Sequence, residues 1–157
     1  GGHFQPGSYT VSAHVPLGAA CGATPDGRHA HEQLADGGLS PMCGRDAHGP
    51  TASLMSVSKL NNALESNGSL LNVKFSPSTL EGEAGLAKLA AYVRAFSRLG
   101  IQHIQFNVVD RATLVDAQEH PERHRDLVVR VAGYSALFVE LSRTLQDDII
   151  NRTEHVL

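Results

Sequence analysis

Extended and helical patterns alternate through the second half of the chain, and this alternation restricts the possible folds most strongly. Residues 70–75 and 101–109 are rich in β-branched and aromatic side chains, so each is predicted to form a strand. Between them, residues 78–100 carry apolar side chains at helical spacing. A strand, a helix and a second strand in this order predict an α/β fold with parallel strands.

The helix between these strands has recognisable ends. Ser78 and Glu81 form a Ser-x-x-Glu pattern, which predicts a capping box in which each side chain bonds the other's backbone N–H. Gly100 suits the position just after a helix, because glycine readily adopts the left-handed conformation found there. The predicted buried stripe of this helix consists of Leu86, Leu89, Val93 and Phe96.

Further elements are expected on both sides of this unit. Residues 9–15 alternate polar and apolar side chains and predict a strand. Helices are expected over residues 51–64, over 110–117 with Asp110 as cap, and over 142–153 with Ser142 as cap. Residues 127–131 are expected to be extended.

Residues 17–50 are dense in glycine, proline, aspartate and serine, and they show no sustained periodicity. Loops of this length are uncommon in a compact domain, where they are usually functional or wrapped over a larger body. We expect this segment to wrap over a larger body.

Gly133 interrupts an extended run at residues 130–136, which reads Arg-Val-Ala-Gly-Tyr-Ser-Ala. An isolated glycine in a strand usually marks a bulge or a tight turn. Glycine can also carry a radical on Cα, which delocalises only when the nitrogen, Cα and the carbonyl become coplanar. A Cβ would crowd that flat arrangement, and glycine has none.

The segment around Gly133 resembles the signature of the glycyl radical enzymes. Other parts of the chain are similar to the same family: residues 34–52, 104–109, 116–118, 138–142, 146–150 and 152–155. Several ordered motifs over 157 residues are not expected by coincidence. Residues 1–157 as a whole therefore resemble the C-terminal portion of such an enzyme.

The resemblance implies part of a ten-stranded β/α barrel, with Gly133 on a loop inserted toward the barrel centre. Residues 1–120 would supply barrel strands, helices and the wrapping loop, and residues 121–157 the glycyl radical loop and the C-terminal helix. Members of the family are several times longer, and this chain begins without methionine. We therefore expect a C-terminal fragment, a processed product or one chain of a split enzyme.

The resemblance assigns the glycyl radical to Gly133. A carbon radical must be shielded from water and oxygen, so a buried loop with apolar neighbours is expected. The residues expected to support this loop are Arg130, Val131, Ala132, Tyr134, Ser135 and Ala136. For Arg130 two roles are open: it bonds loop carbonyls, or it is a solvated charge at the end of a strand.

The predicted strand at residues 9–15 supplies the candidates for a substrate pocket. Alternate side chains of a strand point to opposite faces, so one set could line the cavity of a barrel. The candidates are Ser12, His14 and Val15. The alternative is that both faces of the strand pack against neighbouring elements.

No metal site is expected among the nine histidines. His29 and His31 are two apart, and His120 and His124 are four apart. Pro121 disfavours the uninterrupted helix that the second pair would need for metal binding. No bound cofactor is expected besides the radical itself.

The resemblance also implies the partners. An activating enzyme with an iron–sulfur cluster uses S-adenosylmethionine to remove a hydrogen from the glycine, and the radical then passes to a cysteine that attacks the substrate. Neither Cys21 nor Cys43 lies in the family's catalytic pattern. The catalytic cysteine is thus expected outside this chain, which should be inactive alone.

The predicted function is radical lyase chemistry in an anaerobic, oxygen-sensitive enzyme. Within residues 40–52, Ser40-Pro41, Gly44-Arg45-Asp46 and Gly49-Pro50-Thr51-Ala52 look closer to the diol dehydratase and related lyase branch than to pyruvate formate-lyase. This likeness favours dehydration of glycerol or propane-1,2-diol. Arylacetate decarboxylation, choline cleavage and addition to fumarate are alternatives within the family, and the full enzyme is a possible homodimer. Two other classes stay open: a non-catalytic spare-part protein that repairs an oxygen-damaged enzyme, and an α/β binding module in which Gly133 is only a bulge.

Charge and hydropathy argue against nucleic acid and membranes as partners. The chain has a formal net charge of −3 and no basic cluster, which argues against nucleic acid. No apolar run reaches the length of a membrane span, and no signal-peptide pattern opens the chain. We expect a cytoplasmic protein.

Overall fold

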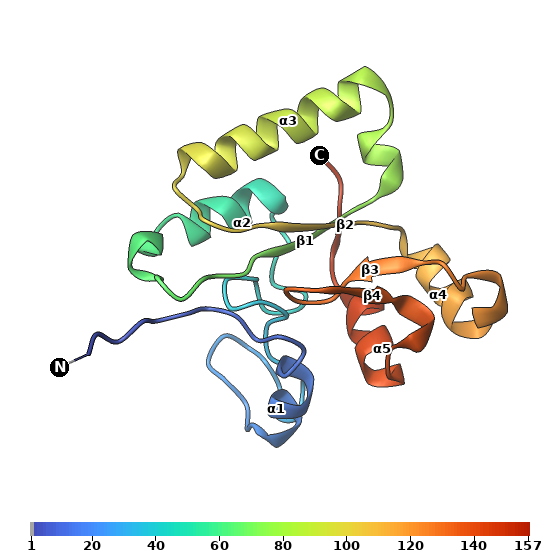
Figure 1. Ribbon diagram of the computed structural model, residues 1–157, viewed down its shortest axis with the longest axis horizontal. Helices are drawn as coiled ribbons and strands as arrows, with labels where there is room; N and C mark the ends of the chain where they lie inside the picture. The colour runs from blue at the N-terminus through green and yellow to red at the C-terminus, as the bar shows by residue number, and fades with distance from the viewer. Residues whose placement is uncertain (1) are drawn as a thin grey trace.

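A three-stranded parallel sheet lies in the middle of the computed structural model, which describes residues 2–157 (Figure 1). Its strands, in spatial order, are β2 (Gln105–Val108), β1 (Asn72–Phe75) and β5 (Glu154–His155). Helix α3 (Gly82–Arg98) connects β1 to β2, as a crossover between parallel strands requires. The predicted α/β class with parallel strands is confirmed.

The other elements are short. The remaining α-helices are α1 (His14–Ala20), α2 (Pro50–Val57), α4 (Arg111–Glu119) and α5 (Arg143–Asn151). An antiparallel hairpin is formed by β3 (Val128–Arg130) and β4 (Ser135–Leu137). Single 3-10 turns are η1 (Asn62–Leu64), η2 (Pro77–Leu80), η3 (Pro121–Arg123) and η4 (Phe138–Glu140).

Two hydrophobic cores lie on opposite sides of β1 and β2 (Figure 1). The first core lies under α2 and α3, where Phe75 contacts Tyr92 edge-on at 5.5 Å between ring centroids and stacks on Phe106 at 5.8 Å. The second core joins α4, α5 and the hairpin and is formed by Val109, Leu114, Ala117, Val129, Val131, Phe138, Ile149 and Ile150. The β3–β4 hairpin is thereby fixed on the face of the sheet away from α3.

The strand predicted over residues 9–15 is wrong. Val11 and Ser12 have positive φ angles of 49° and 55°, so the chain turns sharply at this point and enters α1 at His14. The His14 ring is completely buried, with Nε2 3.0 Å from Asp148 Oδ2. This long-range contact overrides the local alternation, which a turn followed by a helix can imitate over so few residues.

The helix predicted over residues 51–64 is only partly correct, because α2 ends at Val57. The Asn62 carboxamide donates hydrogen bonds to the carbonyl oxygens of Val57 and Leu60, at 3.2 Å and 3.1 Å. These bonds satisfy carbonyls that the end of a helix leaves free, and they divide the segment into α2 and η1.

The capping box predicted at Ser78 is wrong as well. Pro77 begins the 3-10 turn η2, so Ser78 lies inside that turn and its hydroxyl pairs with the Ser76 hydroxyl at 2.9 Å. Glu81 stands at the N-cap of α3 without a capping hydrogen bond from its side chain. At the other end, Gly100 has the predicted left-handed conformation, with φ +69°.

The buried stripe of α3 is rotated from the predicted one. Leu86 and Val93 are 60% and 40% exposed, whereas Tyr92 is buried. Leu89 and Phe96 pack against the first core as predicted. The hydrogen bond from the Tyr92 hydroxyl to the Pro50 carbonyl, at 3.4 Å, fits the choice of Tyr92 for the inner face.

The later elements follow the prediction closely. Asp110 caps α4 by accepting a hydrogen bond from Thr113 N–H at 2.6 Å, and Ser142 is the N-cap residue of α5. Within residues 17–50, α1 ends at Ala20, and residues 21–49 contain neither helix nor strand. Within residues 2–157, no helix combines the length and the apolar character needed to cross a membrane.

Candidate functional site

Gly133 lies at the tip of the β3–β4 hairpin. The loop is closed by a hydrogen bond from Val131 N–H to the Tyr134 carbonyl at 2.9 Å. Gly133 has φ +85°, which glycine adopts without the steric cost that a Cβ imposes. Apart from its two chain neighbours, none of residues 2–157 has an atom within 4 Å of the position that a Cβ would occupy. The hydrogen on that side of Cα therefore faces open space in this chain.

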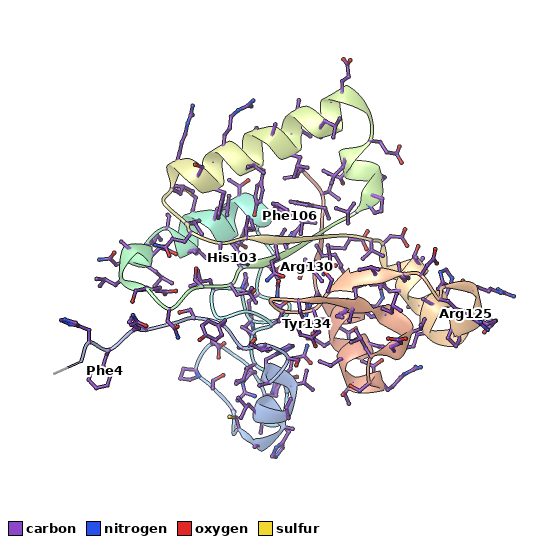
Figure 2. All side chains as sticks on the ribbon, in the orientation of Figure 1. Phe4, His103, Phe106, Arg125, Arg130 and Tyr134 are labelled. Atoms are coloured by element: carbon purple, nitrogen blue, oxygen red, sulfur yellow. The ribbon has the colours of Figure 1, made fainter. Side chains whose placement is uncertain are left out.

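The loop is sheltered at its base and open at its tip. Val131 and Ala132 are fully buried, whereas Gly133, Tyr134 and Ser135 are exposed, and Ala136 is half-buried. Figure 2 labels Tyr134 at this hairpin, on the side of β2 away from α3. The expected burial of the whole loop is thus met only at Val131 and Ala132, because none of the described residues covers the tip.

Two side chains of β2 support the hairpin from the sheet. Gln105 and Asn107 are two residues apart on one face of the strand, and both are buried. Gln105 Oε1 accepts a hydrogen bond from Gly133 N–H at 3.3 Å. Asn107 Oδ1 accepts from Arg130 N–H at 2.8 Å, and its Nδ2 donates to the Arg130 carbonyl at 2.7 Å.

Arg152, just after α5, also holds the base of the loop. Its Nη1 donates to the Val131 carbonyl at 2.8 Å. Its Nη2 lies 2.7 Å from Asp148 Oδ2, and its Nε lies 2.8 Å from Asp36 Oδ2. All three charged side chains are largely buried, so the two carboxylates fix the orientation of the guanidinium toward the loop.

The two carboxylates have opposite pKa shifts. Burial raises the pKa of Asp36, and the charge of Arg152 offsets this only in part. Burial also acts to raise the pKa of Asp148, but the hydrogen bond from His14 and the charge of Arg152 outweigh it and hold the pKa below its ordinary value. A further bond from Gln33 Nε2 to Asp148 Oδ1, at 2.9 Å, stabilises the ionised form.

A narrow cavity of about 40 Å³ lies beside this network. Lys74 lines it and donates from Nζ to the Ile149 and Ile150 carbonyls at the end of α5, at 3.3 Å and 3.2 Å. Burial lowers the pKa of Lys74 to about 8. Across the cavity His155 Nε2 lies 3.0 Å from Asp46 Oδ2. These contacts fix the end of α5 and with it Arg152.

The predicted support residue Arg130 does not bond loop carbonyls. Its Nη1 lies 3.0 Å from the Ser135 hydroxyl across the hairpin, and the side chain is half-buried (Figure 2). The role considered for Arg130 belongs to Arg152, which the sequence did not single out. Of the predicted pocket residues, Ser12 lies in the turn before α1, His14 is buried against Asp148, and Val15 is half-buried in α1.

Sequence reasoning missed Gln105, Asn107 and Arg152 as parts of the site. A usable signal existed for the first two, because polar side chains on one face of a strand whose other face is apolar indicate polar partners on that side. Arg152 lies in the segment 152–155 that resembles the family, but this resemblance assigned it no role. Its role depends on Asp36, which is distant in the sequence and comes close only through folding.

The histidines do not form a metal centre within residues 2–157. His120 Nδ1 and His124 Nε2 both bond Asp116, at 2.9 Å and 2.6 Å. These contacts fasten η3 to α4, which explains the spacing of the pair by local structure.

Comparisons with known proteins agree with this geometry. The glycine radical family model matches residues 35–139. The chain is 53% identical to the probable dehydratase YbiW of Escherichia coli K12, over 100% of this chain and 19% of that protein. It is also similar to the glycerol-bound B12-independent glycerol dehydratase of Clostridium butyricum, with a TM-score of 0.95 and 52% identity, over 100% of this chain and 20% of that one.

A structure described for 1,2-propanediol dehydration in Roseburia inulinivorans is similar over 99% of this chain and 19% of its own, with a TM-score of 0.94 and 57% identity. The chain thus spans about a fifth of the length of the relatives that it matches.

Proposed function

The chain belongs to the glycine radical family, and from this premise we propose that it is the radical-storing part of a dehydratase with the radical on Gly133. The family match excludes the unrelated binding module. The observation that carries the proposal is the state of Gly133 itself. Its N–H donates a hydrogen bond to Gln105, and its positive φ angle suits glycine. The side of its Cα where a Cβ would stand is open.

The proposed reaction begins at this open side. An activating enzyme with an iron–sulfur cluster and S-adenosylmethionine removes one hydrogen atom from Gly133 Cα. The radical that remains spreads over the adjoining nitrogen and carbonyl. It is stored there until a cysteine outside this chain transfers a hydrogen atom to Gly133 and becomes the radical that attacks the substrate.

The two cysteines of this chain are poor candidates for that role. Cys21 is half-buried, and the Cys43 thiol donates to the Asn151 carbonyl at 3.5 Å. Neither cysteine lies in the catalytic pattern that the family resemblance implies. We therefore assign the catalytic cysteine to the remainder of the enzyme, which also covers the exposed tip of the loop.

The full enzyme is proposed to be a ten-stranded β/α barrel. In it, residues 1–120 contribute barrel strands, helices and the wrapping loop, and residues 121–157 the radical loop and C-terminal helix. The exposed apolar side chains of α3, Leu86 and Val93, support a further protein surface above this helix.

A small diol is the proposed substrate. The support is the likeness to the structures described for glycerol dehydratase and 1,2-propanediol dehydration. Loss of one water from a 1,2-diol gives one aldehyde, so the product is readily detected. The pocket candidates Ser12, His14 and Val15 stay predictions for the full enzyme. In this chain they lie in the turn before α1 and at the start of α1 rather than on a strand.

The test uses the full-length enzyme, activated without oxygen by its activating enzyme and S-adenosylmethionine. We expect a doublet in the electron paramagnetic resonance spectrum, which collapses when glycine is deuterated at Cα. The activated enzyme is then offered glycerol, propane-1,2-diol, trans-4-hydroxy-L-proline, choline and arylacetates. Aldehyde from a diol alone supports the proposal, and turnover of another compound reassigns the substrate.

A rescue experiment with an oxygen-damaged enzyme distinguishes a spare-part role from the proposed dehydratase function. A spare-part protein would restore activity to an oxygen-damaged enzyme when it is added as a separate chain. A dehydratase part acts only within its own enzyme. Rescue by the isolated 157-residue chain would favour the repair function over the one proposed here.

A further inference from the structure

Gln105 makes only part of the hydrogen bonds available to its buried carboxamide. Oε1 accepts from Gly133 N–H at 3.3 Å, while Nε2 is buried and has no hydrogen-bond partner within residues 2–157. The side chain is only 4% exposed, so water does not readily replace the missing partner. A buried donor without a partner costs free energy, and this one lies beside the glycine at the tip of the loop.

Asn107, on the same face of β2, shows what a carboxamide in this position can do. It accepts from the N–H of Arg130 and donates to the carbonyl of the same residue, at 2.8 Å and 2.7 Å. Arg130 is extended in β3, and an extended residue presents its own N–H and carbonyl toward the same side. One carboxamide can therefore bind both groups of one extended residue.

Gly133 is not extended in this structure. Its φ of +85° turns the carbonyl out of the plane of its N–H, and Gln105 reaches the N–H alone. Rotation about the N–Cα bond moves the carbonyl while leaving the N–H in place. Gly133 can therefore become flat without breaking the bond that Gln105 already makes.

We propose that Gln105 is a positioning residue for the flat, radical form of Gly133, and that its Nε2 then donates to the Gly133 carbonyl. Gln105 would bind Gly133 as Asn107 binds Arg130. This inference rests on the proposed function, in which Gly133 loses one hydrogen atom from Cα to the activating enzyme's radical. A hydrogen bond to the carbonyl oxygen draws unpaired spin away from Cα, so it stabilises the radical form over the hydrogenated one.

The first test replaces Gln105 by methionine, which has a similar length but neither polar group. The full-length variant is activated without oxygen beside the unaltered enzyme and a Gln118→Met control. Gln118 lies on the surface, where it bonds Asp147. We expect the Gln105→Met radical yield to fall about fivefold, because the one hydrogen bond that only the radical form makes is lost, and its doublet splitting to increase because more spin remains on Cα.

The second test is Gln105→Glu, whose protonated carboxyl can both accept and donate, whereas its ionised form only accepts. At the acidic end of the pH range its doublet splitting should match that of the unaltered enzyme. It should move toward the Gln105→Met value as the carboxyl ionises. The unaltered enzyme should keep one splitting throughout, because glutamine does not titrate.

The outcomes separate this inference from the proposed function. A Gln105→Met enzyme that is folded by circular dichroism and keeps the normal splitting and yield overturns the role of Gln105. If that variant does not fold, a Gln105→Glu splitting at the acidic end that differs from that of the unaltered enzyme overturns it instead. Absence of a doublet from the unaltered enzyme counts against the radical on Gly133 itself.

Discussion

Arg152 donates a hydrogen bond to the Val131 carbonyl, two residues before Gly133, at 2.8 Å. The same guanidinium lies between the carboxylates of Asp36 and Asp148. A contact across 21 residues thus ties the base of the radical loop to the end of α5, and it is built from buried charges.

Replacing Arg152 by glutamine should destabilise the chain by about 3–5 kcal/mol, because two buried carboxylates would lose their cation. Urea unfolding followed by circular dichroism measures the loss. Arg143→Gln on α5 is the matched control, since this exposed arginine pairs with Asp147 at 3.5 Å and should cost no more than about 1 kcal/mol. Equal losses in the two variants would contradict the buried clamp.

Asp148 and Asp36 should change stability in opposite directions with pH. The pKa of Asp148 is lowered in the folded chain, so this residue adds to the free energy of unfolding when the pH is above the unfolded pKa of 3.8. That stabilisation is lost as the pH falls through the folded pKa. The pKa of Asp36 is raised, so its contribution declines as the pH rises from 3.8 through the folded pKa.

Unfolding free energies of Asp148→Asn and Asp36→Asn, measured against pH, check these signs. The unfolding free energy of Asp148→Asn should be lower than that of the unaltered chain at neutral pH, and this difference should shrink on acidification. The unfolding free energy of Asp36→Asn should not show the decline that Asp36 produces as the pH rises above 3.8. Parallel pH profiles for the two variants would be incompatible with the arrangement around Arg152.

Lys74 should make the chain more stable as the pH rises above about 8. Burial lowers its pKa from 10.5 to about 8, so between these values the unfolded chain binds more protons than the folded chain. Lys74→Met should remove this rise in unfolding free energy. The pH series should end below pH 10. Burial raises the pKa of Tyr92 from 10.0, so above that pH the unfolding free energy falls as the pH rises.

Gly133→Ala should abolish the radical doublet and cost about 1–2 kcal/mol of stability, since a Cβ is disfavoured at φ +85°. The space around the Cβ position is open, so steric contacts add nothing. Gly22→Ala is the control, because this glycine is also uncrowded but lacks a positive φ. A doublet that survives in Gly133→Ala would place the radical elsewhere.

Air should cut the activated enzyme at Gly133, because oxygen adds to a carbon radical and breaks the backbone there. Mass spectrometry under denaturing conditions should find a separate piece that begins after Gly133 and contains residues 134–157. Gly133→Ala treated in the same way should stay whole. An uncut chain in a sample with a measured radical would count against this site.

Periodicity predicted the β1–α3–β2 unit because one face of each of these elements is buried against the first hydrophobic core. It also placed Gln105 and Asn107 on one face of β2, although it did not show what lies opposite. The error at Ser78 has a local cause, since Pro77 begins a 3-10 turn there. These parts of the fold depend mainly on neighbouring residues.

The parts that sequence could not predict depend on distant contacts. His14 appeared to lie in a strand, yet it is placed by Asp148, which is 134 residues away. Arg152 reaches the loop only because Asp36 and Asp148 orient it. The proposal that Gly133 carries the radical came from the motif around it, and the open side of its Cα came from the structure.

The last strand, β5, pairs with β1 at the edge of the central sheet. The segment after Gly133 also contributes Phe138 and Ile149 to the second core. A molecule severed at Gly133 should therefore stay assembled as a nicked complex of two peptides. Oxygen damage would then escape detection by gel filtration, because the inactivated protein keeps the size and shape of the intact one.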